Sequence, residues 1–241
     1  MLRSLLVITY LIMFMFVSML VFPLYPVLLF LGLKRAAYAY SFFLKALWGK
    51  SLLYVAGVKV HVIGEEHVPE SDSVCFISNH QGMADILVIT AFTPKVVGFI
   101  AKKELKKMPI INLWMVINHC IFIDRGNMRQ AARAINRGAD YIRRGYPLVL
   151  FPEGTRSRGP SMGRFKRGSI KLALKSNAAI VPITVNGTYK LFEEQNQIRK
   201  GTVTLKFHKP IDASTLSPKE RRELPDRLAH IIEGGLHEIT Q

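Results

Sequence analysis

The segment VCFISNHQGMAD, residues 74–85, carries the first indication of the fold. It opens with an apolar run, Val74–Ser78, whose length and composition predict a β-strand. A polar turn containing His80 follows, and Asp85 is expected in the first turn of a helix. Folds that alternate strands with helices assemble their sites at strand ends, so this turn is a candidate site.

The same alternation continues on both sides of this segment. Apolar runs predict further strands at residues 58–63, 96–101, 120–123, 147–151, 179–185 and 202–207. Residues 128–144 have the apolar periodicity of an amphipathic helix. Another helix is predicted from Ser217, a candidate N-cap followed by Pro218 and by Glu220 as the glutamate of a capping box. This interleaving predicts an α/β fold with a mixed, largely parallel sheet flanked by helices.

The start of the chain has a different composition. No charged residue occurs from Ser4 to Leu33. Residues 4–22 alone would form a helix roughly 29 Å long, close to the thickness of a bilayer's hydrocarbon core. Pro23 and Pro26 then break or kink the path of the helix. The pattern predicts a hydrophobic helical hairpin that associates with a membrane.

A cleaved signal peptide is the alternative interpretation of this start. The apolar run is far longer than that of a signal peptide, and Lys34 and Arg35 follow it directly, so the sequence disfavours cleavage. We therefore divide the chain into a membrane-associating hairpin, residues 1–50, and an α/β domain, residues 51–241.

One polar stripe interrupts the second half of the hairpin. Lys34, Tyr38, Ser41 and Lys45 recur at helical spacing on an otherwise apolar surface. Such a helix suits the headgroup boundary, with its lysines directed toward water and phosphate. A hairpin that dips into one leaflet would keep Arg3 on the same face as the basic remainder, whereas a single spanning helix would not. We expect the cytoplasmic face of the inner membrane, and leave open whether the hairpin spans the bilayer.

The charge of the chain is strongly positive. Its 33 Lys and Arg residues against 17 Asp and Glu residues give a formal net charge of +16. Such a surplus attracts anionic partners, among which acidic phospholipid, a phosphate-rich cofactor, an acidic carrier protein and nucleic acid all qualify. Charge alone does not choose among these partners.

His80 and Asp85 have the residue types of an acid–base pair. Histidine takes up a proton near neutral pH. A carboxylate on one ring nitrogen would set the tautomer and leave the other nitrogen to remove a proton from a hydroxyl group. The alternative is an ordinary polar turn in which Asp85 is a charge at a helix N-terminus. From the residues alone, both interpretations stay open.

Three further segments end predicted strands. FPEGTRSRG, residues 151–159, combines glycines that allow close backbone approach with arginines that offer paired donors to phosphate, although a solvated charged turn is the alternative. Asp124 and Arg125 end another run, and a surface ion pair is their alternative. Val181–Ile183, sequence VPI, is uninformative on its own.

Taken in order, the four segments resemble the motifs of the glycerolipid acyltransferase family, which includes the 1-acylglycerol-3-phosphate acyltransferases. Asn79–Asp85 matches its N-H-x-x-x-x-D motif, and Phe122–Arg125 matches its second motif. Phe151–Ser157 matches F-P-E-G-T-R-S residue for residue, and Val181–Ile183 matches the fourth. The resemblance runs from about residue 55 to 190. Gly82 departs from a frequent serine and Asn112 from a usual glycine, which leaves the exact substrate open.

The resemblance implies an activity and a set of site residues. His80 would deprotonate the sn-2 hydroxyl of lysophosphatidic acid, Asp85 would orient His80, and the oxygen would attack the thioester of acyl-CoA or acyl-carrier protein to give phosphatidic acid. No cofactor beyond the acyl donor is expected. The residues expected to bind substrate are Arg125, Glu153, Gly154, Thr155, Arg156, Lys102 and Lys103.

Other functions compete with this interpretation. Glycerol 3-phosphate or another lysolipid would be an alternative acceptor. A non-catalytic basic protein that docks on membranes or nucleic acid is a second alternative, but nucleic-acid binding is expected to interleave basic residues with stacking aromatics. A metal-dependent hydrolase is disfavoured, because no second histidine stands at ligand spacing and Cys75 and Cys120 form no C-x-x-C pair. We therefore expect lysophosphatidic acid, an acyl thioester and an anionic membrane as partners, and neither a metal nor nucleic acid.

Overall fold

The computed structural model describes residues 2–124 and 126–239, including the backbone but not the side chains of residues 128 and 167. Its strands are β1 Val58–Ile63, β2 Val74–Ser78, β3 Gly98–Lys102, β4 Ile121–Ile123, β5 Leu148–Leu150, β6 Ala179–Asn186, β7 Gly201–Phe207 and β8 Ile211–Asp212. Its α-helices are α1 Leu2–Val21, α2 Leu24–Phe30, α3 Lys34–Ala56, α4 Ala84–Phe92, α5 Pro109–Ile117, α6 Met128–Arg143, α7 Arg167–Ser176 and α8 Pro218–Glu238. Short 3-10 turns are η1 Glu65–His67, η2 Lys103–Lys107 and η3 Thr188–Leu191.

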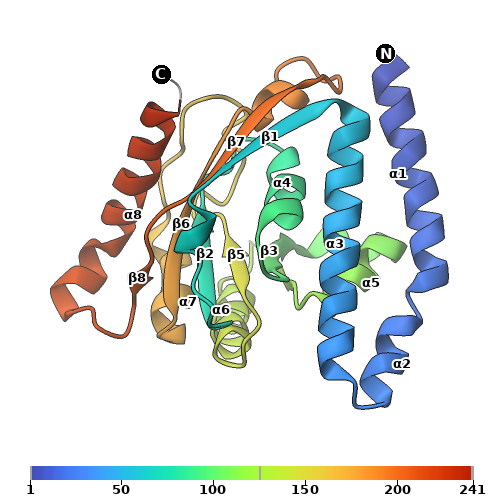
Figure 1. The fold of residues 1–241 in the computed structure, drawn as a ribbon. Coiled ribbons are helices and arrows are strands. Elements are labelled where there is room, and N and C mark those ends of the chain that lie inside the picture. Colours follow the sequence, from blue (N-terminus) through green and yellow to red (C-terminus); the bar gives the residue numbers. More distant parts are fainter. Residues whose placement is uncertain (1, 125, 240–241) are drawn as a thin grey trace.

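The strands form one mixed sheet with helices on both sides (Figure 1). Their order is β1-β7-β6-β2-β5-β3-β4, with β8 also beside β6. Every neighbouring pair is parallel except β6–β7 and β6–β8. The predicted α/β fold with a largely parallel sheet is confirmed. The predicted bounds of β1 and β2 agree with the structure, and the capping box on Ser217 begins α8, which continues through Pro225.

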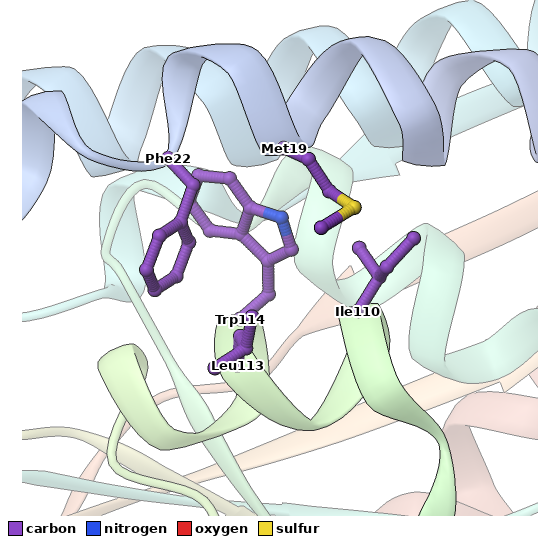
Figure 2. A pocket seen from close by; sticks show the side chains of 5 residues that line it. All are labelled: Met19, Phe22, Ile110, Leu113 and Trp114. Carbon is purple, nitrogen blue, oxygen red and sulfur yellow. The ribbon is translucent and has the colours of Figure 1, made fainter.

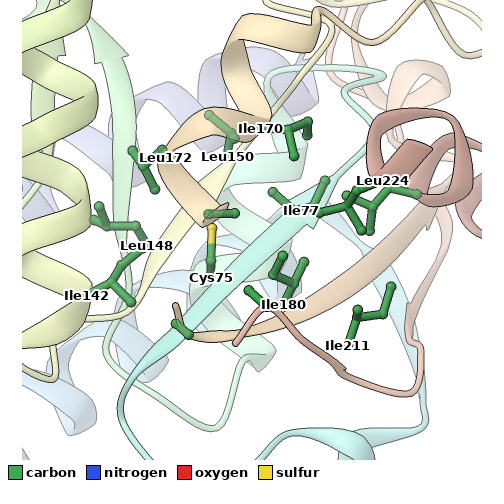
Figure 3. Packing of buried hydrophobic residues seen from close by; sticks show 14 of the residues in the cluster. Cys75, Ile77, Ile142, Leu148, Leu150, Ile170, Leu172, Ile180, Ile211 and Leu224 are labelled. Atoms are coloured by element: carbon green, nitrogen blue, oxygen red, sulfur yellow. The ribbon is translucent and has the colours of Figure 1, made fainter. Parts of the chain in front are cut away.

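Two apolar layers cover the faces of the sheet, because alternate side chains of a strand point to opposite faces. On one face, Cys75 and Ile77 of β2 pack with residues of α6, α7 and α8 (Figure 3). On the other face, Val74 and Phe76 pack with α4 and with Leu53 of α3. All five residues of β2 are buried, as expected for a central strand covered on both sides.

The N-terminal helices form an antiparallel pair beside the sheet, with α1 and α2 against α3 (Figure 1). Nη1 of Arg3 donates to the carbonyl of Ala56 at 2.7 Å, so the start of α1 lies at the end of α3. The predicted boundary at residue 50 falls inside α3, which continues to Ala56 and ends at Gly57, a residue in the left-handed conformation with φ 72°. The division into two domains stays a prediction.

The segment Leu2–Phe30 is compatible with membrane association. The segment is 29 residues long; the mean hydropathy of its most apolar 18-residue window is 2.7, and only 11% of that window is buried. Among the residues that the structure describes, it is the one helical segment long and apolar enough to cross a membrane. α1 also meets α5, where Met19 and Phe22 line an apolar pocket with Ile110, Leu113 and Trp114 (Figure 2).

The polar stripe of α3 corrects one prediction. Ser41 and Lys45 are buried, at 4% and 6% exposure, and face the protein instead of lipid headgroups. Nζ of Lys45 donates to the carbonyl of Thr90 at 3.1 Å and to that of Thr93, at the end of α4. The last carbonyls of a helix lack partners within it and carry partial negative charge, and Lys45 supplies these two with hydrogen bonds. Lys34, by contrast, is exposed.

Candidate active site

The parallel strands bring the predicted site residues to one edge of the sheet. Strands β2, β5, β3 and β4 run in the same direction, so their carboxyl ends lie together. His80 follows β2, Glu153 follows β5, Lys102 ends β3 and Asp124 follows β4. Segments separated by many residues in sequence thus meet because their strands are parallel neighbours.

His80 and Asp85 form a hydrogen-bonded pair. Nδ1 of His80 lies 2.7 Å from Oδ2 of Asp85, and the amide of Gly82 donates to the same oxygen at 2.9 Å. Oδ1 of Asp85 accepts from the hydroxyl of Thr188. The Asp85 side chain is fully buried and that of His80 is 15% exposed. This arrangement orients the imidazole through Nδ1 and leaves Nε2 as the nitrogen available to accept a proton.

The turn that carries this pair is anchored to β6. The Asn79 side chain forms two hydrogen bonds with the backbone of Val185, donating to its carbonyl and accepting from its amide, both at 2.8 Å. The ring of His80 stacks on Phe151, with centroids 4.1 Å apart and planes 17° apart. The first and third motifs are therefore in direct contact through their side chains.

Glu153 connects the loop of the third motif to the His80 turn of the first motif through a hydrogen bond of its buried side chain. One of its oxygens accepts from the amide of His80 and the other from the amide of Gly163, both at 2.7 Å. The residue is 4% exposed, and burial raises the pKa of its carboxyl group, while the two amides act in the opposite direction. Its contacts are thus to backbone, and its predicted role in substrate binding stays a prediction.

Arg156 is held by Glu193, a residue that no sequence motif indicated. Its Nη1 donates to Oε1 of Glu193 at 2.9 Å, and its side chain is 30% exposed. Glu193 and Thr188 both come from the connection between β6 and β7. Neither stands in a recognisable motif, and no signal in this single sequence distinguishes them from ordinary loop residues.

The other predicted binding residues differ in their settings. Gly154 has φ 73°, and Thr155 and Lys102 are exposed. Nζ of Lys103 lies 2.7 Å from Oδ2 of Asp124, and this contact lowers the pKa of the Asp124 carboxyl. Arg125 lies outside the described residues.

Comparison with known proteins decides the family. The model of a protein family described as Acyltransferase matches residues 59–186, a range that contains all four motifs. The chain belongs to this acyltransferase family. This match, together with the relatives and the solved structure described next, confirms the resemblance to glycerolipid acyltransferases.

Individual relatives agree with this assignment. The chain is 35% identical over 178 residues to a 1-acyl-sn-glycerol-3-phosphate acyltransferase of Borreliella burgdorferi, covering 73% of this chain and 70% of that protein. A probable 1-acyl-sn-glycerol-3-phosphate acyltransferase of Mycoplasma pneumoniae is 36% identical, with coverage of 63% and 58%. In this relative and in several others, the match spans less than two thirds of the relative's own length.

A solved structure shares the whole architecture. The crystal structure of PlsC, the 1-acyl-sn-glycerophosphate (LPA) acyltransferase of Thermotoga maritima, superposes with a TM-score of 0.81 at 27% identity. The alignment covers 99% of this chain and 97% of that one, so the likeness includes the N-terminal helices as well as the sheet.

Proposed function

We propose that this acyltransferase moves a fatty acyl group to the sn-2 hydroxyl of lysophosphatidic acid and so forms phosphatidic acid. The observation that carries the proposal is the 2.7 Å contact between His80 Nδ1 and Asp85 Oδ2 at the edge of the sheet where Arg156 also lies. The names of the relatives agree with this acceptor.

The chemistry follows from the geometry of the pair. Nε2 of His80 removes the proton from the acceptor hydroxyl as its oxygen attacks the thioester carbonyl. The tetrahedral intermediate collapses, the carbon–sulfur bond breaks, and the imidazolium returns the proton to the departing thiolate. Buried Asp85 stabilises the imidazolium in between. No cofactor is needed beyond the donor, which we propose to be acyl-CoA or acyl-carrier protein.

Arg156 supplies the cation for the acceptor's phosphate in this proposal. Guanidinium groups bind phosphate through paired hydrogen bonds, and its side chain is partly exposed beside the His80 turn. Exposed Lys102 and Lys103, on the same sheet edge, would serve the phosphates of the donor or an acidic carrier. Arg125, whose placement is not described, is a further candidate for the acceptor's phosphate.

We also propose where the reaction takes place. The apolar segment Leu2–Phe30 would be buried in the lipid, and the exposed basic surface would face anionic headgroups at the cytoplasmic side of the inner membrane. Arg3 donates a hydrogen bond to Ala56, so the start of α1 lies beside the end of α3 that leads into β1. A hairpin that enters and leaves the membrane on the same side requires this arrangement.

An acceptor comparison tests the proposed function. Purified protein in detergent would receive lysophosphatidic acid, glycerol 3-phosphate or a neutral lysolipid, each with acyl-CoA and with acyl-carrier protein. Because each hydrogen bond to a charged group is worth about 1.5–3 kcal/mol, we expect lysophosphatidic acid to exceed the neutral lysolipid at least about tenfold in kcat/KM. Equal rates on the two lysolipids would contradict phosphate recognition, and a higher rate on glycerol 3-phosphate would reassign the acceptor.

A further inference from the structure

Glu193 is a buried acidic residue outside the four motifs that contacts two of them. It follows η3, and its side chain is only 3% exposed. Oε1 accepts from Nη1 of Arg156 at 2.9 Å and from the backbone amide of Met83 at 2.7 Å. Met83 lies between His80 and Asp85, so one carboxylate oxygen links the arginine of the third motif to the turn of the first.

We infer that Glu193 is a positioning residue that sets Arg156 at a defined distance from His80 and thereby selects the acceptor. This inference rests on the proposed function, in which Arg156 binds the acceptor's phosphate. An arginine has five N–H donors in a rigid planar fork, so the donor used by Glu193 orients the fork and leaves others for a ligand. A free arginine would have to be ordered by the ligand itself, at a cost in affinity.

The hydrogen bond from the Met83 amide to Glu193 ties the orientation of Arg156 to the turn that carries His80. In lysophosphatidic acid the phosphate and the sn-2 hydroxyl stand on adjacent carbons of glycerol, so the few bonds between them confine their distance to a limited range. An arginine tied to the His80 turn presents one defined distance between the phosphate-binding cation and the base. With the cation already held at that distance, the acceptor can bind without having to order the Arg156 side chain itself.

The glycine at position 82 is part of the same arrangement. A Cβ atom at Gly82 would lie 3.0 Å from Cδ of Glu193 and 2.6 Å from its Oε2, and the second distance is closer than Cβ atoms approach other atoms in proteins. Oε2 is buried without a hydrogen-bond partner among the described residues, which is a cost for a carboxylate. Glycine at 82 therefore leaves the space that the Glu193 carboxylate occupies.

Kinetics in detergent test the inference. In Glu193→Ala we expect KM for lysophosphatidic acid to rise about 3- to 10-fold, the range expected when a side chain must be ordered on binding. The KM for the acyl donor should not change. We expect kcat to fall less than about threefold, because Gly82 and Thr188 still hold Asp85. Glu193→Gln, which keeps an accepting oxygen, should lose less than the alanine variant.

Two further comparisons separate positioning from a general structural role. In an Arg156→Ala background, Glu193→Ala should change KM less than about twofold, because residues that act through one another are not additive. Gly82→Ala should reproduce the Glu193→Ala defect, and it should add little to the Glu193→Ala variant. Glu194→Ala, which removes the same charge from the exposed neighbouring residue, should leave KM unchanged.

The outcomes also separate this inference from the proposed function. If the unaltered enzyme did not discriminate between lysophosphatidic acid and a neutral lysolipid, both the proposed function and this inference would be overturned. Discrimination that persists in the unaltered enzyme and in Glu193→Ala alike would overturn the inference alone, as would independent, multiplicative effects of Glu193→Ala and Arg156→Ala. A lower KM in Glu193→Ala would show that the carboxylate competes with the phosphate, and would also overturn it.

Discussion

Thr188 donates its hydroxyl hydrogen to Oδ1 of Asp85, across 103 positions of sequence. The contact completes the shell of a fully buried carboxylate, whose other oxygen faces His80 and the Gly82 amide. We expect Thr188→Val to lower kcat about tenfold, because an unpaired oxygen lets the carboxylate turn away from the imidazole. Thr188→Ser should keep most activity. Steady-state kinetics would check this, and equal rates for the valine and serine variants would contradict it.

His80 itself is expected to carry the proton transfer. Changing it to alanine should lower kcat at least about 100-fold, since general-base catalysis contributes on the order of 10²–10⁴. Asp85→Asn should also be severe, because an amide favours the wrong imidazole tautomer. Acceptor binding, measured by equilibrium dialysis against detergent micelles, should persist in both variants. A His80→Ala variant with an unaltered rate would end the general-base assignment.

Gly49 lies where α3 packs tightly against α4. A Cβ at this position would lie 2.6 Å from Cβ of Ala91 in α4. We expect Gly49→Ala to lower the free energy of unfolding by about 1–3 kcal/mol through overpacking, despite the higher helix propensity of alanine. Gly234→Ala in α8 is the matched control, because nothing lies within 4 Å of its added Cβ. There the same change should stabilise by about 0.5–1 kcal/mol.

Thermal unfolding in detergent would measure both glycine variants. The two melting temperatures should move in opposite directions, that of Gly49→Ala downward and that of Gly234→Ala upward. A Gly49→Ala variant as stable as the unaltered protein would show that α3 and α4 adjust freely to the extra methyl group.

His208 predicts a loss of stability in acid. Burial lowers the pKa of its imidazole to about 4, and Lys206 acts in the same direction. The unfolded chain takes up this proton near pH 6.5 and the folded protein only near pH 4, so stability is lost as pH falls through this interval. We expect the melting temperature to decline between pH 7 and pH 5, and to decline less in His208→Gln. Parallel pH profiles for the two proteins would exclude His208 as the cause.

Membrane binding should depend more on apolar burial than on charge. At 1 M salt, screening shortens the reach of surface charges to about 3 Å and leaves apolar burial intact. The exposed apolar segment Leu2–Phe30 should therefore keep the full chain in the membrane fraction through a high-salt wash, with detergent needed for release. Protein that appeared in the supernatant after salt alone would show that this segment is no anchor.

Local patterns predicted much of the architecture. The strands β1 and β2, the start of α8 and the apolar start of the chain follow from composition, periodicity and capping chemistry over a few neighbouring residues. Lys45 shows the limit of this reasoning. Helical spacing placed Lys45 and Ser41 on one face, but periodicity does not say what that face contacts, and it meets the end of α4 instead of lipid headgroups.

The sequence by itself determined the chemistry of the candidate site and its position after a strand. His80, Asp85 and Glu153 lie within short segments whose residue types suit acid–base work and phosphate binding. Only the tertiary structure decided which residues form hydrogen bonds to these motif segments. Thr188 and Glu193 reach the site because β6 lies parallel to β2, and the loop after β6 therefore emerges beside the His80 turn. Strand order depends on contacts between distant parts of the chain, which no local pattern of residues encodes.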